Sequence, residues 1–492
     1  MADIMAPAAT DTRFGNRRTL IGGELVESTS SEWLESVNPA NEDVIGHVPL
    51  GGKADIARAA EAAETAFPAW GALSVQERAA YLRELGRQLQ ARSAEILEVE
   101  VADTGSTVGK LRGDVGHAVG ALEQYAGLGL ELKGETVPAS NNNLHLTVRQ
   151  PYGVVGRIAP FNHPIYFASG GMAAPLMAGN TVVVKPPEQS PISSAILSEI
   201  CRDVFPPGVV NIVPGLGAGA GDALVRHPTI RRIGFIGSVA TGLAIQRAAA
   251  EVCVKHISLE LGGKNPLIVF PDVDAEEAAS AAVLGMNFAW QGQSCGSMSR
   301  LLVHESLYDD VVARVKAKVD AIRMGDPADP ASQMGPINSA AQYARVLRYI
   351  GYGKEDGARL LSGGSRPDGA EFQRGYWVRP TVFADVTPDM RVGREEIFGP
   401  VLSILRWSTT EEAIGIANGT EYGLTASIWT RDIKQALNTA KAVQSGYIWI
   451  NGVSAHYRGT PFGGLKNSGT GREEGLDELL SYTETKAIHI AL

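Results

Sequence analysis

The sequence predicts an α/β protein built around two mostly parallel sheets. Short apolar runs alternate with helical stretches in two series, one between residues 152 and 261 and one after residue 265. This alternation is typical of repeated βαβ units, in which helices cover both faces of a parallel sheet. The chain has 492 residues, of which 44% are hydrophobic and 20% charged. It can therefore bury large cores and form roughly two to four domains.

The first hundred residues are expected to be largely helical. The run from Ala54 to Phe67 is rich in alanine and stops at Pro68. Ser74 and Glu77 have the spacing of a capping box, which marks the start of a helix. The apolar residues that follow keep helical spacing: Leu82, Leu85, Leu89 and Ile96. Residues 1–15 lack the apolar run of a secretion signal and predict a loose tail.

A domain seam is expected between residues 130 and 152. From Leu144 the segment LHLTV alternates like a half-exposed strand, Pro151 interrupts it, and GVVGRI begins another strand. Beyond the seam, the predicted strands of the first series are Thr181–Val184, Val209–Val213, Ile233–Ile236 and His256–Leu261.

The second series predicts another α/β domain from residue 261 to about residue 450. It contains the strands PLIVF and RLLVH and a helix from Asp309 to Ile322. The C-terminal segment SYTETKAIHIAL ends in alternating apolar residues that have no obvious partner nearby in the sequence. An unpaired edge of this kind often pairs with another chain.

Charge and cysteine content exclude several classes of protein. The balance of 44 Lys and Arg against 54 Asp and Glu gives a formal net charge of -10, which argues against binding to nucleic acid or anionic membranes. The longest apolar stretch, Ala281 to Trp290, is much shorter than the roughly 20 residues that span a bilayer. Three cysteines cannot form a disulfide framework in so long a chain, so a reducing, cytoplasmic location is expected. There is no Cys-x-x-Cys pair, and no metal site is predicted.

Cys295 and Glu260 are the first candidates for chemistry. Cys295 lies in GQSCGS, where small neighbours leave room for a substrate. Most lone cysteines are buried and inert, and that interpretation applies to Cys201 and Cys253. Glu260 ends an apolar strand before Gly-Gly, so partial desolvation should raise its pKa and suit it to take a proton near neutral pH. The alternative is an acid that is solvated at a strand end.

Two further segments have features of a nucleotide site. The turn from Gly237 to Gly242 follows a strand and precedes a helix, which offers free N–H groups and the positive end of a helix dipole to a phosphate. It is not the G-x-G-x-x-G of the usual dinucleotide fold, and turns of this kind without ligands are common. Lys185 and Glu188 at the end of a parallel strand suit ribose hydroxyls. Taken alone, they are better interpreted as a solvated charged turn.

Seven segments in one order resemble the aldehyde dehydrogenase superfamily of the hydrolytic, non-acylating type, from about Thr19 to Ile490. They are PFNHP from Pro160, AGNTVVVKPPEQSP from Ala178, FIGSVATG from Phe235, LELGGKNP from Leu259, GQSC ending at Cys295, EIFGP from Glu396 and PFGGLKNSGTGRE from Pro461. The resemblance implies a three-part subunit: a Rossmann-like NAD-binding domain (residues 1–131 and 152–260), a catalytic domain (261–450), and a bridging and oligomerisation sheet (132–151 and 475–492). Residues 451–474 are expected to form a loop that lines the substrate tunnel. The resemblance also implies a homodimer or a homotetramer.

The resemblance assigns roles residue by residue. Cys295 matches the nucleophile, Glu260 the general base, and Asn162 the amide that holds the oxyanion together with the backbone N–H of Cys295. The positions that match cofactor contacts are Lys185, Glu188, Phe235, Gly237, Ser238, Glu396 and Phe398. A carboxylate at Glu188 would accept hydrogen bonds from a free 2′-hydroxyl and repel a 2′-phosphate. NAD is therefore favoured over NADP.

These residue types imply that an aldehyde is oxidised to a carboxylic acid through a thioester. The Cys295 thiolate attacks the carbonyl, the thiohemiacetal gives its hydride to the nicotinamide, and water activated by Glu260 releases the acid. Because a thiolate must form, nearby positive charge and dipoles, including the bound nicotinamide ring, are expected to lower the pKa of Cys295.

Two departures from the family pattern bear on the aldehyde. Many relatives have Thr where Gly296 follows the nucleophile, and a bulky side chain where Gly170 lies eight residues beyond Asn162. Both glycines would enlarge the tunnel, although Gly170 serves helix packing in an equally weighted alternative. The predicted lining is Phe167, Gly170, Trp290, Gly296, His456 and Phe462. A roomy, partly aromatic pocket favours a bulky aromatic or terpenoid aldehyde.

Three other functions stay open at this point. His456 and Arg458 together suit the distal carboxylate of a semialdehyde. A CoA-acylating enzyme would transfer the acyl group to CoA, and Glu260 at the base position counts against it. A non-catalytic homologue conflicts with the intact set of Cys295, Glu260 and Asn162.

Overall fold

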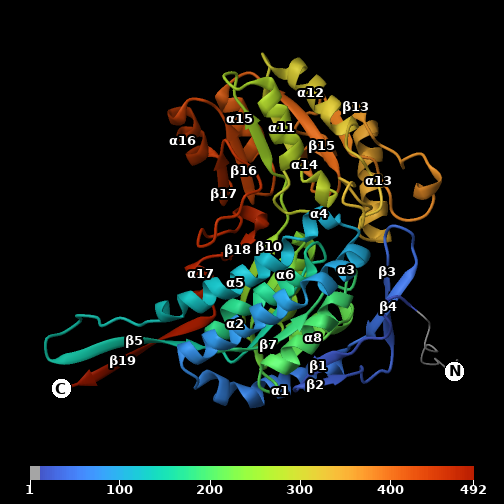
Figure 1. The fold of residues 1–492 in the computed structure, drawn as a ribbon. Coiled ribbons are helices and arrows are strands. Elements are labelled where there is room, and N and C mark those ends of the chain that lie inside the picture. Colours follow the sequence, from blue (N-terminus) through green and yellow to red (C-terminus); the bar gives the residue numbers. More distant parts are fainter. Residues whose placement is uncertain (1–11) are drawn as a thin grey trace.

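The computed structural model describes residues 12–492, so most of the predicted N-terminal tail lies outside the described range. Two large sheets, each covered by helices, stand one above the other, and a two-stranded ribbon projects from one side (Figure 1). The predicted α/β class with two mostly parallel sheets is confirmed. None of the helices in the described part of the chain is long and apolar enough to cross a membrane.

The first sheet has eight strands, and its central five run parallel. In spatial order they are β18 (Gly469–Thr470), β10 (His256–Leu261), β9 (Ile230–Gly237), β6 (Val154–Ile158), β7 (Thr181–Lys185), β8 (Val210–Ile212), β1 (Thr19–Ile21) and β2 (Glu24–Val26). Its long helices are α1 (Lys53–Gly71), α2 (Val75–Ala91), α3 (Ser93–Thr104), α5 (Asp114–Leu128), α8 (Ile192–Val204) and α10 (Val239–Ala250). Val182 and Val184 of β7 join one hydrophobic core and Val183 joins the other. A strand buried on both faces therefore has the continuous apolar run seen in the sequence.

The second sheet has seven strands, all parallel to their neighbours except β13. Their order is β13 (Arg359–Ser362), β14 (Thr381–Ala384), β15 (Val401–Trp407), β12 (Arg300–His304), β11 (Pro266–Val269), β16 (Thr425–Trp429) and β17 (Tyr447–Ile450). The helices over it are α11 (Ala275–Gly285), α12 (Tyr308–Asp320), α13 (Ala340–Glu355), α15 (Thr410–Asn418) and α16 (Ile433–Ala442). Short helices elsewhere are α4 (Val108–Leu111), α6 (Pro164–Ser169), α7 (Ala173–Met177), α9 (Asp222–Arg226), α14 (Arg391–Arg394) and α17 (Leu476–Ser481).

The C-terminal segment has its partner within the same chain. Strand β19 (Thr483–Ala491) pairs in antiparallel register with β5 (Asn143–Pro151), the strand predicted at LHLTV. The two form the ribbon that extends away from both sheets in Figure 1. Apolar side chains stay exposed along it: Leu144, Val148, Ile488 and Ile490.

The prediction of a largely helical first hundred residues is wrong for residues 19–49. Strands β1 and β2 form a hairpin at the edge of the first sheet, and β3 (Trp33–Val37) pairs with β4 (Val44–Pro49) in a hairpin of their own. The first hairpin turns at Gly22 and Gly23, whose φ angles of 65° and 89° are readily adopted only by glycine. The hairpin therefore buries Leu20 and Ile21, and no helix is needed.

Two helix boundaries also differ from the prediction. Helix α1 continues past Pro68 to Gly71, because Trp70 in that last turn is buried and its Nε1 donates to the carbonyl of Leu176 at 3.3 Å. The capping box of Ser74 and Glu77 is confirmed. Its helix ends at Ala91, so Ile96 belongs to α3 and reaches the same core from a separate helix.

Candidate active site

The carboxyl ends of the parallel strands in the first sheet carry most of the predicted site residues. Ile158 of β6 is in register with Lys185 of β7 on one side and Phe235 of β9 on the other. Glu260 of β10 lies opposite Ile236 of β9, and Asn162 follows the end of β6 by four residues. Ligands of open parallel sheets bind outside these strand ends. The topology therefore gathers residues from four strands at one edge.

A cavity of about 750 Å³ opens at this edge. All seven predicted cofactor residues line it: Lys185, Glu188, Phe235, Gly237, Ser238, Glu396 and Phe398. Asn162, Glu260 and Cys295 line it as well. We call it the first cavity; its size suits a dinucleotide.

A second cavity, of about 270 Å³, lies on the other side of the same three residues. Asn162, Glu260 and Cys295 line it together with the six predicted pocket residues: Phe167, Gly170, Trp290, Gly296, His456 and Phe462. The predicted nucleophile, base and oxyanion donor thus lie where two cavities of different size meet.

The loop that carries Cys295 is held from both sides. The Nδ2 of Asn265 donates to the carbonyls of Cys295 at 2.6 Å and Ser297 at 2.9 Å, while its Oδ1 accepts from the N–H of Thr425 at 3.1 Å. Gly292 has a φ of 64° and packs directly on the carbonyl of Gly399. Any side chain there would collide with backbone, so this glycine permits the close approach of the two loops.

The pKa of Cys295 moves in the direction opposite to the predicted one. Burial raises it first, and the carboxyl groups of Glu260, Glu396 and Glu474 raise it further, while the backbone of Gly296 opposes them. The expectation of a lowered pKa is therefore wrong for the groups that the protein itself supplies. Carboxylates rather than cations surround the thiol, and a thiolate would need positive charge from a bound ligand.

Glu260 is 6% exposed, so the solvated alternative does not hold. Burial is the main cause that raises its pKa well above the usual value, and Glu473 and Glu474 add to it. Its Oε1 is buried without a hydrogen-bond partner in the described part of the chain. A carboxyl group in this state is a competent proton acceptor near neutral pH.

Asn162 is 9% exposed, and its amide makes no hydrogen bond with any other residue between 12 and 492. The amide is therefore free to donate into the space shared by the two cavities. The backbone N–H of Cys295 is likewise not used by another residue in the described chain. Two such donors suit an oxyanion.

The strand ends supply the parts of a nucleotide site. Lys185 is buried and its Nζ lies 2.8 Å from Oε2 of Glu188, whose side chain is 32% exposed. Ser238 caps α10, accepting from the N–H of Thr241 at 3.3 Å. Gly237 lets the ring of Phe235 fold directly against the turn, because a Cβ there would collide with it. These groups fit a dinucleotide, with ribose hydroxyls near Glu188 and phosphates near the start of α10.

Glu396 lines the first cavity and is anchored by the backbone. Its Oε1 accepts from the N–H of Gly263 at 2.9 Å, and its carboxyl group packs on Gly262. Burial raises the pKa of Glu396 to about 7, against the lowering influence of Gly263, Arg345 and Lys264. Phe398 beside it has a φ of 56°, which is unusual for a residue other than glycine.

The two departures from the family pattern do not have equal effects on the second cavity. A Cβ at Gly296 would meet nothing closer than Ser294 Oγ at 3.9 Å, so this glycine does leave open space. At Gly170 a Cβ would lie 3.3 Å from the ring of Tyr166 and 3.5 Å from Ala121 of α5. The ring of Tyr166 fills the space that Gly170 frees, which supports its helix-packing role. Of the two glycines, only Gly296 therefore leaves open space.

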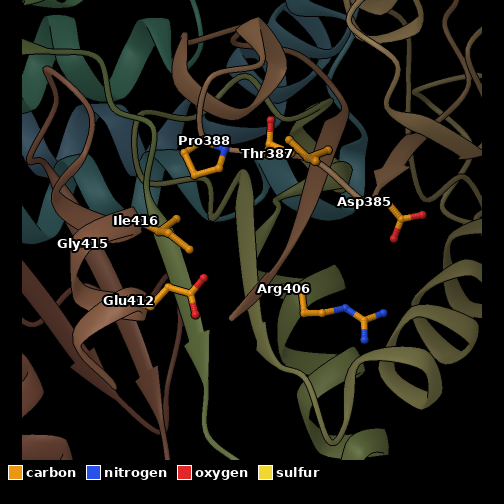
Figure 2. A pocket seen from close by; sticks show the side chains of 8 residues that line it. Asp385, Thr387, Pro388, Arg406, Glu412, Gly415 and Ile416 are labelled. Atoms are coloured by element: carbon orange, nitrogen blue, oxygen red, sulfur yellow. The ribbon is translucent and has the colours of Figure 1, made fainter. Parts of the chain in front are cut away.

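A further open hollow on the described surface has no part in this arrangement. About 650 Å³ in size, it lies on the second domain, and its side chains surround the space without converging (Figure 2). Asp385 there is held by Arg359, and Arg406 lies over the ring of Tyr308. Among residues 12–492, no cluster of three or more His, Cys, Asp or Glu side chains is arranged to hold a metal ion.

Several residues of the site have no role in the sequence prediction. Asn265 holds the loop that carries Cys295, but the segment LELGGKNP in which it lies predicts a role for Glu260 only. Glu473 lines the second cavity and lies 3.1 Å from the guanidinium of Arg157. His163 follows Asn162 directly and pairs with Asp114 at 2.9 Å. His163 could have been predicted as a site residue because it directly follows Asn162, the predicted oxyanion donor. The local sequence around Arg157 and Asp114 gives no such indication.

Comparisons with known proteins show the family of the chain. A model described as the aldehyde dehydrogenase family matches residues 25–488. The chain is 46% identical over 465 residues to aldehyde dehydrogenase tropH of Talaromyces stipitatus, covering 93% of this chain and 90% of that protein. It is 40% identical over 489 residues to aldehyde dehydrogenase 1A1 of Gallus gallus, covering 98% and 95%. A solved NAD+ complex of an aldehyde dehydrogenase from Bacillus cereus matches with a TM-score of 0.94 at 39% identity, covering 97% of each chain.

Proposed function

The chain belongs to the aldehyde dehydrogenase family, and we propose that it oxidises an aromatic or terpenoid aldehyde to the carboxylic acid through a thioester on Cys295. It is an NAD-dependent enzyme, in agreement with the NAD+ complex of the Bacillus cereus relative. One observation carries the proposal: Cys295, Glu260 and Asn162 line both cavities, so all three lie where cofactor and aldehyde would meet.

Each of the three residues has a distinct part in the reaction. Cys295 Sγ adds to the aldehyde carbon, and the oxygen is held by the Asn162 amide and the Cys295 backbone N–H; one such donor contributes about 10²- to 10³-fold in rate. NAD, when bound, supplies the hydride acceptor. Glu260 then takes a proton from the water that hydrolyses the thioester. The residues that hold NAD are those of the first cavity, with Glu188 favouring a free ribose 2′-hydroxyl.

The second cavity supports an aromatic substrate. Trp290 and Phe167 form one wall, while Phe462 and His456 belong to an aromatic cluster with Tyr447 on another, their ring centroids 4.9 to 6.0 Å apart. A volume of about 270 Å³ admits one ring with small substituents.

A semialdehyde that bears a carboxylate is the second candidate. His456 does not favour it, because its Nδ1 is paired with Glu474 at 2.9 Å. Arg458 does favour it, since this exposed guanidinium packs on Gly120 at the edge of the second cavity and forms no ion pair within residues 12–492. Replacing Arg458 by Ala should raise KM for a carboxylate-bearing aldehyde alone if this candidate is correct.

The test is NADH formation, followed by absorbance, with a panel of aldehydes and with NAD and NADP in parallel. We expect benzaldehyde-like compounds to exceed acetaldehyde in kcat/KM, NAD to exceed NADP, and Cys295→Ala to be inactive. Addition of CoA should leave the free acid as product. A preference for acetaldehyde would overturn the substrate class, and turnover by Cys295→Ala would overturn the nucleophile.

The organisation of the chain is part of the proposal. We assign NAD binding to the first sheet, the nucleophile to the second, tunnel lining to the loop at 451–474, and subunit contacts to the ribbon of β5 and β19. Its exposed Leu144, Val148, Ile488 and Ile490 support a homodimer or a homotetramer. The molar mass in solution, measured by light scattering, tests this. All three cysteines are free, which supports a reducing, cytoplasmic compartment.

A further inference from the structure

His163 and Asp114 form a buried pair on the wall of the second cavity. His163 lies between Asn162 and α6, and its Nδ1 is 2.9 Å from Oδ2 of Asp114 at the start of α5. Their side chains are 16% and 2% exposed. A carboxylate oxygen accepts this hydrogen bond, so Nδ1 is the ring atom that donates it; in that tautomer of the imidazole the lone pair lies on Nε2.

Two polar atoms of this pair have no partner. Nε2 of His163 makes no hydrogen bond with any described residue. Oδ1 of Asp114 is buried and equally unpaired within residues 12–492. A buried acceptor without a donor is costly and uncommon. Because both residues line the second cavity, a molecule bound there can supply the missing donor.

The ring of His163 is fixed in orientation by its neighbours. It packs edge-on against Trp290, with centroids 4.4 Å apart at 61°, and against Phe167 at 5.8 Å and 77°. Both of these aromatic side chains also line the second cavity. The acceptor on Nε2 is therefore presented at a defined place beside the aromatic walls.

The charges around the pair favour a neutral hydrogen-bond donor over an anion. Burial is the main cause that lowers the pKa of His117, one turn along α5, and this disfavours a positive charge on its ring. The guanidinium of Arg157 already pairs with Glu473 and donates to the hydroxyl of Tyr482 at 2.8 Å. Asp114 would repel a carboxylate placed against this pair. Arg458, the cation that lines the same cavity without an ion pair in the described chain, packs on Gly120 and would be the partner of such a carboxylate instead.

We propose that His163 and Asp114 form a subsite that binds a hydroxyl group on the ring of an aromatic aldehyde. The hydroxyl O–H donates to Nε2 of His163 or to Oδ1 of Asp114. This inference rests on the proposed oxidation of an aromatic aldehyde and narrows its substrate class. The pair acts on specificity and takes no part in the transfer of hydride or acyl group.

The test compares kcat/KM for the three monohydroxybenzaldehydes with that for benzaldehyde on the same enzyme preparation. A hydrogen bond to this pair should raise kcat/KM of the best isomer about 10- to 100-fold over benzaldehyde. His163→Phe should reduce this ratio to about one, and Asp114→Asn should reduce it at least about threefold. His117→Phe, a matched change in a histidine that lines the same cavity without a carboxylate partner, should leave the ratio intact.

The ratio is independent of the fraction of enzyme that is correctly folded, because both substrates meet the same preparation. A wild-type ratio near one, or a ratio unchanged in both His163→Phe and Asp114→Asn, overturns the subsite while aldehyde oxidation stands. If no aldehyde yields NADH, the proposed oxidation fails instead. Calorimetric binding of hydroxybenzaldehyde and benzaldehyde to Cys295→Ala then decides the subsite, and equal affinities would overturn it.

Discussion

Replacing Asn265 by Ala should slow the nucleophilic step by more than its effect on stability explains. Asn265 is buried and makes three hydrogen bonds, at 2.6, 2.9 and 3.1 Å, two of them to the loop that carries Cys295. At about 1 kcal/mol each, their loss should reduce the free energy of unfolding by about 3 kcal/mol. A displacement of Sγ by about 1 Å should in addition slow attack on the aldehyde on the order of 100-fold.

Asn180 provides a matched control for this change. It is fully buried, accepts from the N–H of Gly153 at 3.1 Å and donates to the carbonyls of Pro175 at 3.1 Å and Tyr482 at 3.0 Å. It lies at the amino end of β7, remote from the carboxyl edge that bears the site. Asn180→Ala should therefore cost similar stability and leave the nucleophile in place.

The assay is the burst of NADH in a single turnover, with the alkylation rate of Cys295 by iodoacetamide as a second readout. Denaturant-induced loss of fluorescence gives the stability of both variants. We expect Asn265→Asp to be slower still than Asn265→Ala, because a carboxylate would face two carbonyl oxygens and raise the pKa of the thiol further. Equal burst rates for Asn265→Ala and Asn180→Ala would refute the positioning role.

Three more outcomes are expected. Glu260→Gln should retain the NADH burst but lower kcat about 10²- to 10⁴-fold, with acid-quenched enzyme carrying the thioester; equal steady-state rates would remove Glu260 from the role of base. Glu260 acts as the carboxylate, and its pKa is raised well above the usual value. Thioester hydrolysis should therefore slow as the pH falls through that raised pKa. This loss of activity should begin at a higher pH than it would for an exposed Glu. Asn162→Ala should slow the burst about 10²- to 10³-fold with little change in KM for NAD, and a normal burst would place the oxyanion elsewhere. Glu188→Ser should raise KM for NAD and lower KM for NADP, because a carboxylate that repels a 2′-phosphate is removed; an unchanged ratio of the two KM values would count against ribose recognition by Glu188.

The parts of the fold that the sequence predicts are those with a strong local pattern. Strand β7 contains three consecutive valines between Gly179 and Pro186, and α2 opens with a complete capping box. The strands at Thr19–Ile21 and Glu24–Val26 have three residues each, too few for a period to be recognised. Their pairing depends on β8 nearly two hundred residues later, as the register of Leu20 with Ile212 shows.

The same limit applies to the site. Cys295, Glu260 and Asn162 each stand in a short segment rich in glycine or proline, so each can be singled out locally. His163 and Asp114 are 49 residues apart, and Arg157 and Glu473 are 316 residues apart. Such pairs exist only once the chain has folded. They supply much of the charge around the reacting groups, which local sequence does not show.

The raised pKa of Cys295 has a consequence for the order of events. The Cys295 thiol is influenced by three carboxyl groups from segments far apart in the sequence: Glu260, Glu396 and Glu474. The charge of each one disfavours ionisation of the thiol. No cation is among the groups of the described chain that shift the pKa of Cys295. Lys264 acts on Glu396, and burial lowers the pKa of Lys264 to about 7. Positive charge therefore has to enter with a ligand in the first cavity, where Phe398 and Glu396 lie beside Cys295.

A thiol held neutral by its own protein is protected from oxidation and from aldehydes that arrive early, because only the thiolate is a strong nucleophile. The acidic surroundings that oppose the first step would thus be offset by the cationic nicotinamide ring, so the cofactor should bind before the aldehyde.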